Sequence, residues 1–353
     1  SLGISYPPSL GAWPAVILFG AFAWVELVWG TSGGSVPANL ALAILAYSAI
    51  TWAGMFVFGK EDWLRGGEAF SVAFGLLARF APTEVRVTNP EGCTLCSSAD
   101  LRREDGGCIN CYQGFVRAEE ADREWNLRPY AIGLLTNNPP QLSMTVFVLL
   151  VLSTATFDGF LETPLSASIL DTLFPALKWM GAGAVDVIRT LALIAFPTLF
   201  IGVFLIFSKF MAMTLEGNYS AAELARLFVF SIVPISIAYH LAHYLLFFLI
   251  GGQLIIPQAS DPFGFGWDLL GTANYRIDIA IVDAWFSWYA AVIAIVVGHI
   301  AAVGLAHVTA LRAFKDKRLA LRSQYPMLAL MVGYTMVSLW ILAQPIVESR
   351  PGS

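Results

Sequence analysis

Seven long apolar stretches dominate the chain, and shorter polar segments separate them. Each has about 20 residues or more with few charges, which is enough for an α-helix to cross the hydrocarbon core of a bilayer. Tryptophan often lies near their ends, as in the aromatic belts of membrane proteins. We therefore predict membrane-spanning helices at residues 11–30, 37–59, 141–163, 183–208, 227–256, 284–311 and 324–346.

Two segments between the second and third stretches break this pattern. Residues 61–81 mix charged and apolar side chains at helical spacing, which is typical of an amphipathic helix at the membrane interface. Residues 82–130 form the one sizeable polar insert. We predict an all-α membrane protein with about seven transmembrane helices, two in residues 1–60 and five in residues 141–353. The insert is predicted to be a small zinc-ribbon-like domain.

Charge distribution predicts the orientation of these helices. The short loop 312–322 reads RAFKDKRLALR, and basic loops of this length stay in the cytoplasm. Counting spans backwards places residues 60–140 and the amino end in the cytoplasm as well. The loops 164–182 and 258–282, with the carboxyl end, then lie outside. The protein is thus predicted to cross the cytoplasmic membrane several times.

Composition supports a membrane protein and excludes several other classes. Of the 353 residues, 57% are hydrophobic and 13% are charged, whereas a soluble domain carries about twice that share of charge. The lipid bilayer is therefore the main expected partner. The net charge of −5 argues against binding to nucleic acid. The chain contains no P-loop, GxSxG, HExxH or dinucleotide-binding motif.

All four cysteines lie in the insert, in the segment CTLCSSADLRREDGGCINC. Two CxxC pairs supply four thiolates, which is the ligand set of a structural zinc site. We predict zinc, ahead of iron, at Cys93, Cys96, Cys108 and Cys111, with Gly106 and Gly107 allowing close approach of the backbone. The alternative is a pair of disulfides, which a cytoplasmic location disfavours. Such a domain is also a candidate docking site for a partner subunit.

The four histidines lie in two of the predicted spans. If loop 258–282 joins two antiparallel helices, His240 and His299 reach the same depth, and His243 is one turn from His240. We predict that these three converge on a zinc, copper or iron ion, and that His307 lies about 12 Å too far along its helix to join them. Two alternatives remain, namely haem b between His240 and His299, or histidines that only link helices through hydrogen bonds.

Acidic residues near the outer ends of two spans are further candidates. Asp158 and Glu162 are four residues apart and share a helix face, so they are predicted to supply oxygen ligands or a general base. Glu162 alone also fits an ordinary interfacial carboxylate. Glu26 lies at a similar depth in the first span. Near the fourth span, Lys178, Asp186 and Arg189 fit a structural ion pair.

The loop 258–282 is rich in glycine and aromatic residues. Its apolar side chains predict a lid over the outer mouth of the bundle, with Asp268 and Arg276 as polar contacts. A re-entrant packing segment fits the same sequence equally well.

Several of these motifs together resemble a family of bacterial polytopic membrane proteins labelled fenitrothion hydrolase. The resemblance covers most of the chain, and it implies hydrolysis of organophosphate esters, location in the bacterial inner membrane and further membrane segments upstream. It rests on WPAVILFGAFAWVELVW (13–29), GKEDWLRGGEAFSVAFGLLARFAP (59–82), the paired CxxC motifs, NLRPYAIGLL (126–135), TFDGFLETP (156–164), YHLAHY (239–244), DPFGFGWDLLGTA (261–273) and GHIAAVGLAH (298–307).

Three functions are compatible with these observations. The first is a metal-dependent hydrolase, in which a metal ion at the histidines generates hydroxide that attacks apolar phosphoesters. The second is a non-enzymatic membrane subunit, assembly factor or transporter. The third is a redox subunit that holds haem b or copper.

Overall fold

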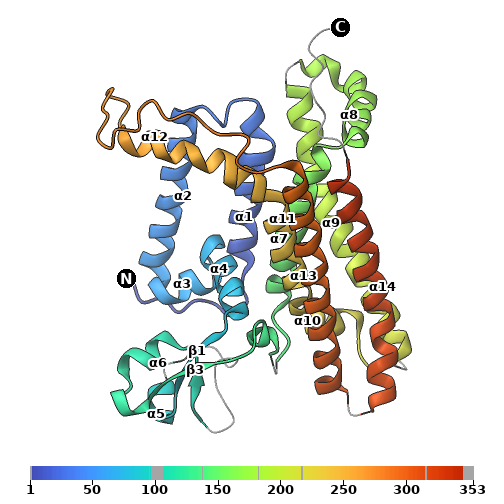
Figure 1. Cartoon of the computed structure of the whole chain (residues 1–353). Helices are drawn as coiled ribbons and strands as arrows, with labels where there is room; N and C mark the ends of the chain where they lie inside the picture. Colours follow the sequence, from blue (N-terminus) through green and yellow to red (C-terminus); the bar gives the residue numbers. More distant parts are fainter. Residues whose placement is uncertain are drawn as a thin grey trace.

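The computed structural model describes residues 2–94, 96, 106–136, 138–181, 183–215, 218–314 and 316–344. Within these residues, seven helical segments are long and apolar enough to cross a membrane. This confirms the predicted number of candidate spans and the mainly helical class, and it is consistent with a multi-pass membrane protein. The segments are α1 (Trp13–Leu27) with the 3-10 helix η1 (Trp29–Thr31), α2 (Pro37–Phe58), α7 (Leu142–Leu161), α9 (Gly183–Thr214), the continuous run Ala221–Ser260, α13 (Ala284–Ala313) and α14 (Lys317–Leu342) (Figure 1).

The run Ala221–Ser260 is built from several helices in series. They are α10 (Ala221–Phe228), η6 (Val229–Ile232), α11 (Val233–Gly251), η7 (Gly252–Leu254) and α12 (Ile255–Ser260). Its amino end is set by a capping box, in which Ser220 and Glu223 each accept a hydrogen bond from the other's backbone N–H. Pro234 occupies the first turn of α11, where its missing N–H disturbs no helical hydrogen bond.

The helices α7 and α11 form the centre of the bundle. Of the apolar window in each segment, 61% is buried for α7 and 67% for the run containing α11, whereas none is buried for α2. The main core joins side chains from several helices, including Phe147, Phe228 and Met327. The span α2 therefore lies at the periphery, and the residues that can meet inside the bundle come mainly from the other helices.

The helices α11 and α13 pack closely against each other at Gly298. A Cβ atom added to Gly298 would lie 2.4 Å from the Cβ of Ala238 and 2.8 Å from the carbonyl oxygen of Pro234. Small residues at such crossings let helix backbones approach each other in membranes. This contact brings the backbones of α11 and α13 together one residue before His299.

The two ends of the bundle carry the segments that the charge pattern assigned to opposite sides. The polar insert and the turn between α13 and α14 lie at one end, while α12 and α8 (Pro164–Leu177) lie at the other (Figure 1). The helix α8 and the 3-10 helix η5 (Lys178–Met180) occupy the segment that we predicted to be a loop. Which end faces the cytoplasm remains a prediction.

The predicted single interfacial helix is divided into α3 (Lys60–Gly66) and α4 (Ala69–Phe80). The division follows two glycines, Gly66 and Gly67, and a capping residue, Glu68. The Glu68 carboxylate accepts hydrogen bonds from the backbone N–H groups of Phe70 at 3.1 Å and Ser71 at 2.6 Å. An N-cap of this kind begins a new helix rather than continuing the previous one.

The insert contains a small antiparallel sheet with strand order β2-β1-β3, which the all-α prediction missed. Arg128 joins the insert to the end of α4. It donates one hydrogen bond to Glu84 Oε2 at 3.1 Å and another to the carbonyl oxygen of Ala81, the residue directly after α4, at 3.1 Å. The elements are β1 (Thr83–Val87), α5 (Pro90–Cys93), β2 (Cys108–Ile109), α6 (Tyr112–Arg117), η3 (Glu120–Asp122), β3 (Arg123–Leu127) and, after it, η4 (Ile132–Leu134).

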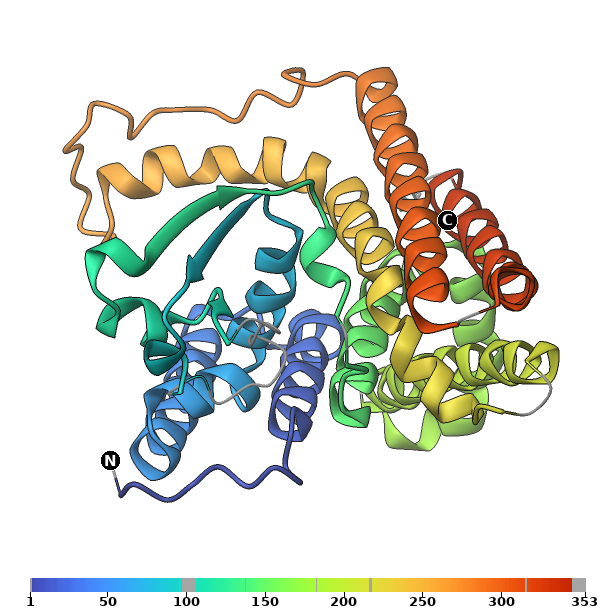
Figure 2. The same ribbon diagram turned by 90° about the horizontal axis from the view of Figure 1, so that it is seen from below.

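The loop after α12 runs back alongside the helices that precede it, α12 and η7 (Figure 2). Gln253, in η7, holds it there, since its side chain donates to the carbonyl oxygen of Asp278 and accepts from the hydroxyl of Tyr275. Asp268 accepts a hydrogen bond from Ser260 at 2.8 Å. The aromatic rings of Phe263 and Phe265 remain about 70% exposed. The loop therefore packs against the helices that precede it, η7 and α12, rather than as the predicted lid over the outer mouth of the bundle.

Candidate functional site

A hydrogen-bonded cluster inside the helical bundle centres on Asp158 of α7. Its Oδ2 atom accepts hydrogen bonds from His243 Nε2 at 2.9 Å and from the Tyr244 hydroxyl at 2.8 Å, both on α11. Because an ionised carboxylate only accepts hydrogen bonds, the Nε2 atom of His243 carries the proton. A neutral ring then leaves Nδ1 as the hydrogen-bond acceptor. The structure thus brings together two predicted residues and one, Tyr244, that sequence reasoning missed.

The glycine next to Asp158 allows α7 and α11 to approach each other here. A Cβ atom on Gly159 would lie 2.8 Å from the Tyr239 hydroxyl and 3.5 Å from Cε1 of His243. The Tyr239 side chain is 1% exposed, and its hydroxyl has no hydrogen-bond partner among the described residues. Buried hydroxyl groups normally have such a partner. An unpaired donor therefore lies beside the Asp158–His243 pair.

Two more ionisable groups flank the cluster. Glu26 on α1 interacts electrostatically with Asp158 and His243, and its side chain is exposed. The ring of His240 lies against Tyr244, with ring centroids 6.1 Å apart, and its Nδ1–H donates to the carbonyl oxygen of Ser236 at 2.7 Å. The Asp158 carboxylate favours positive charge beside it, so it stabilises a protonated imidazole on His243.

His299 lies outside this cluster, contrary to the predicted convergence of three histidines. Its Nδ1–H donates to the carbonyl oxygen of Ile295 at 2.8 Å, and its ring stacks on Tyr334 of α14 at a centroid distance of 6.0 Å. The close contact at Gly298 leaves no room for a porphyrin between α11 and α13 at this depth. The residues therefore do not fit haem b held between His240 and His299.

The histidines do not form a ready-made metal site either. Across the described part of the chain, the only group of three or more cysteine, histidine or acidic residues with ligand atoms within 4.8 Å of one another is Cys93, Cys96 and Cys108. His240, His243 and His299 therefore do not fit the metal site predicted from their depth. His307 bonds to Gln324 Oε1 at 2.9 Å, apart from the Asp158 cluster.

The remaining polar candidates also lie apart from the cluster. Glu162 is the exposed C-cap of α7, which fits the interfacial alternative better than a catalytic role. Arg189 donates to the Thr31 hydroxyl at 2.5 Å, and Trp24 donates to Thr190 at 2.9 Å. These hydrogen bonds join η1 and α1 to α9.

The four cysteines of the insert lie together in its core. Cys93 is joined to Cys108, and Cys96 to Cys111, so each bond links one CxxC motif to the other. The pair of disulfides that was the alternative to zinc is therefore the state of these cysteines in the structure, and each cysteine is at most 2% exposed. The glycine that lies against the sulfurs is Gly114, because a Cβ atom there would lie 3.1 Å from Cys108 Sγ. Gly106 packs against Pro90 instead.

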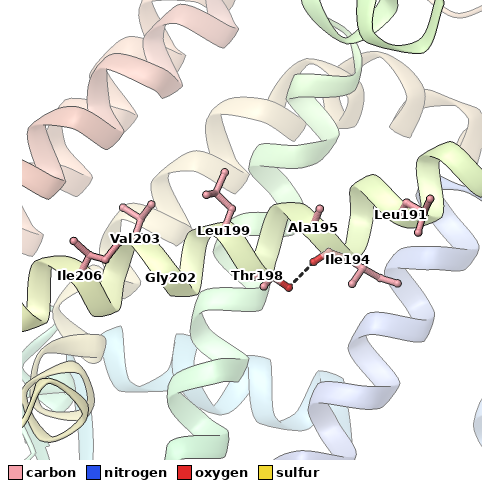
Figure 3. Close-up of a pocket in the computed structure, with 8 residues that line it drawn as sticks. All are labelled: Leu191, Ile194, Ala195, Thr198, Leu199, Gly202, Val203 and Ile206. Carbon is pink, nitrogen blue, oxygen red and sulfur yellow. Dashed lines mark hydrogen bonds between the residues drawn. The ribbon is translucent and has the colours of Figure 1, made fainter. Parts of the chain in front are cut away.

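A shallow apolar hollow lies on one face of α9, and its lining residues carry no ionisable group (Figure 3). The residues that line it all come from α9. Its single hydroxyl, on Thr198, donates to the carbonyl oxygen of Ile194 at 2.7 Å. Since Leu191 and Leu199 are about 60% exposed, this face is suited to contact with lipid.

No protein-family model, curated protein or solved structure matches the chain. The resemblance to the fenitrothion hydrolase family therefore remains an expectation, and the function must be argued from the geometry of the Asp158 cluster.

Proposed function

We propose that the chain is an integral membrane protein in which Asp158 and His243 form an acid–base pair that hydrolyses apolar esters dissolved in the bilayer. The observation that supports this most is the Asp158 carboxylate, which accepts from both His243 Nε2 and the Tyr244 hydroxyl. Ionisable groups are costly within a membrane and usually functional there. A carboxylate that orients a histidine is also the arrangement used to activate nucleophiles in many hydrolases.

In the proposed reaction, His243 is the general base. Its Nδ1 atom takes a proton from a water molecule as the water oxygen bonds to the phosphorus or acyl carbon of the ester. Asp158 and Glu26 stabilise the resulting imidazolium. The same proton then passes to the leaving oxygen, which departs as an alcohol or phenol. The unpaired hydroxyl of Tyr239 is suited to donate a hydrogen bond to the oxygen that gains negative charge.

The experiment is hydrolysis of an apolar aryl phosphotriester by the protein in lipid nanodiscs. We expect Asp158→Asn and His243→Gln each to lower kcat/KM about a hundredfold or more. Glu162→Gln is the matched control, since Glu162 ends the same helix and is exposed. Folded Asp158 and His243 variants with unchanged activity would refute the proposal, as would a wild-type protein with no activity on this class of ester.

A second candidate function is proton transfer through the bundle, in line with a transporter. Aromatic and imidazole rings form a row from His243 to Tyr239, Tyr334 and His299, with centroid distances of 6.1, 6.3 and 6.0 Å. The Tyr334 hydroxyl also contacts Thr156 Oγ1 at 2.7 Å. This function would be favoured if proteoliposomes containing the protein take up protons, if a Tyr334 variant loses this uptake, and if the protein hydrolyses no ester.

For the insert, we propose a structural zinc ion bound by the four cysteines in the reduced protein. In support, Cys93, Cys96 and Cys108 offer sulfur atoms within 4.8 Å of one another, and the N–H of Gly114 donates to Cys111 Sγ at 3.4 Å. Such N–H donors stabilise metal-bound thiolates. Zinc would cross-link the two CxxC motifs and have no role in the reaction.

The insert is also proposed as a docking surface for a partner subunit. The strand β3 lies at the edge of the sheet, and it exposes Trp125 at 74% and Leu127 at 85%. Exposed apolar side chains on an edge strand are typical of protein contact surfaces.

A further inference from the structure

Apart from the Asp158 cluster, a buried polar side chain, His299, lines a groove between α13 and α14. The groove has a volume of about 310 Å³, and it is lined by Val296, His299, Ile300, Val303 and Thr335. The side chains of Val296 and Ile300 are 43% and 67% exposed. The groove thus opens on the outer surface of the bundle, which faces lipid in the proposed membrane protein.

The ring of His299 presents a hydrogen-bond acceptor that the protein does not satisfy. Its Nδ1 atom lies 2.8 Å from the carbonyl oxygen of Ile295, and a carbonyl only accepts, so Nδ1 carries the proton. In the neutral ring, Nε2 is then an acceptor. His299 is 9% exposed, and Nε2 is buried without a partner among the described residues. A buried acceptor without a partner is destabilising, and such groups are rare in folded proteins.

The other polar group in the groove is an acceptor as well. The Thr335 hydroxyl donates its hydrogen to the carbonyl oxygen of Met331 at 2.8 Å, which leaves oxygen lone pairs on its other side. Among the described residues that line the groove, the side chains therefore offer two acceptors and no free donor. A ligand that complements this groove must bring its own O–H or N–H group.

The position of His299 along α13 restricts the ligand further. It is 15 residues from Ala284 in a helix that ends at Ala313, so it lies about 22 Å along a helix of about 45 Å. This is the middle of the hydrocarbon core, which charged lipid headgroups do not reach. A donor at this depth must belong to a molecule that dissolves in hydrocarbon.

We infer that the groove beside His299 binds an apolar, membrane-dissolved molecule with a hydroxyl donor, of the phenol or hydroquinone class. The hydroxyl bonds to His299 Nε2, and the apolar body lies against Val296, Ile300 and Val303. The exposed side chains of Val296 and Ile300 line the groove, so they are free to reorient as the ligand enters. The site is separate from the Asp158 cluster and does not depend on the proposed hydrolysis.

The test compares para-nonylphenol with its methyl ether, para-nonylanisole, in which a methyl group replaces the hydrogen of the hydroxyl donor. Binding to the full chain in nanodiscs is measured by the rise in melting temperature with probe concentration. We expect the phenol to bind about tenfold more tightly than the ether, as for one net hydrogen bond to a buried acceptor. His299→Phe keeps a ring to stack on Tyr334 but removes the acceptor, so it should abolish the difference. His307→Phe, on the same helix but outside the groove, should retain it.

Equal affinity for the two probes would overturn the inference, and it would indicate that a trapped water satisfies Nε2. A difference that persists in His299→Phe would overturn it too. If His299→Phe does not fold, nitrogen NMR of the wild-type protein labelled at histidine decides, because the His299 Nε2 resonance must shift with the phenol and not with the ether. Asp158→Asn should leave phenol binding unchanged, which separates this result from any failure of the proposed hydrolysis.

Discussion

Replacing Gly298 with alanine adds one methyl group where α11 and α13 pack closely against each other. The new Cβ atom would lie 2.4 Å from Ala238 Cβ and 2.8 Å from the carbonyl oxygen of Pro234. Non-bonded carbon atoms rest about 3.5–4.0 Å apart, so the helices must separate by about 1 Å or more. Neither neighbour is the end of a flexible side chain. The strain must therefore be relieved by movement of a helix.

The expected cost follows from two opposing effects. Overpacking of this kind costs about 1–3 kcal/mol, whereas the better helix propensity of alanine returns up to about 1 kcal/mol. We expect Gly298→Ala to lower the free energy of unfolding by about 1–2 kcal/mol. Gly304→Ala is the matched control, because it lies on the same helix with no atom within 4 Å of the added Cβ. It should be neutral or slightly stabilising.

Both variants can be compared by unfolding in mixed micelles as the denaturing detergent increases, with tryptophan fluorescence as the signal. The difference between the variants removes most of the propensity effect. If their unfolding free energies agree within about 0.5 kcal/mol, α11 and α13 do not meet at Gly298. The separation of His240 from His299, and the exclusion of haem between them, would then lose their basis.

Three further predictions concern the insert and the interfacial helices. First, the protein purified under reducing conditions should contain one zinc per chain by elemental analysis, and Cys93→Ser should lose it. Second, Arg128→Gln should destabilise the protein by about 1.5–3 kcal/mol in thermal unfolding, because it removes the buried one of the two arginines that pair with the Glu84 carboxylate, which is 6% exposed. Third, Glu68→Ala should cost about 0.5–2 kcal/mol through loss of the N-cap of α4.

The effect of Glu68 should also depend on pH. Burial raises the pKa of Glu68, but hydrogen bonds from Ser71, Tyr47 and Phe70 outweigh burial and lower the pKa below its ordinary value of 4.5. The carboxylate therefore stabilises the fold above pH 4.5, and this contribution is lost as the pH falls through the lowered pKa. The wild-type protein and Glu68→Ala should converge in melting temperature in strong acid, and a constant difference would contradict this origin.

The zinc and Arg128 predictions can also be refuted by a single measurement each. Absence of zinc from protein that is fully reduced would refute the proposed zinc site, because no disulfide joins the CxxC motifs in that state and zinc is the link proposed there. Arg86 also pairs with Glu84, but its side chain is 33% exposed, so Arg86→Gln is the control for Arg128→Gln. An equal loss of stability in both variants would show that burial of the Arg128–Glu84 pair is not the cause.

The spans could be predicted from the sequence because length and apolar content alone decide whether a helix can cross a bilayer. Shorter elements were less visible. The helix α8 occupies a predicted loop, and Pro175 within it interrupted the pattern from which a helix would be inferred. The amphipathic pattern of residues 61–81 continues across the break between α3 and α4, so it predicted one helix. The capping chemistry of Gly66, Gly67 and Glu68 outweighs that pattern and divides the segment into two helices.

The candidate site shows where inference from spacing ends. Counting residues gives the depth of a side chain in a helix bundle, but not the neighbour that it faces, because the rotation of each helix depends on its contacts. His240 and His299 were assigned the same depth. The small residues Gly298 and Ala238 let α11 and α13 pack directly against each other, which separates the two histidines. His299 therefore stacks on Tyr334, and His240 lies on the side of Asp158.

The Asp158 carboxylate provides the missing constraint. A carboxylate within apolar helices needs donors nearby, and the neighbouring helix α11 presents adjacent donors in His243 and Tyr244. Tyrosine in an apolar run is usually read as core or as part of an aromatic belt, which is why Tyr244 was missed. Asking which hydroxyl or imidazole groups can reach each intramembrane acid would have pointed to Tyr244, since it directly follows His243. The depth of a residue in its helix limits which side chains can meet. Among these, the hydrogen bonds that a buried carboxylate needs identify the residues that contact it.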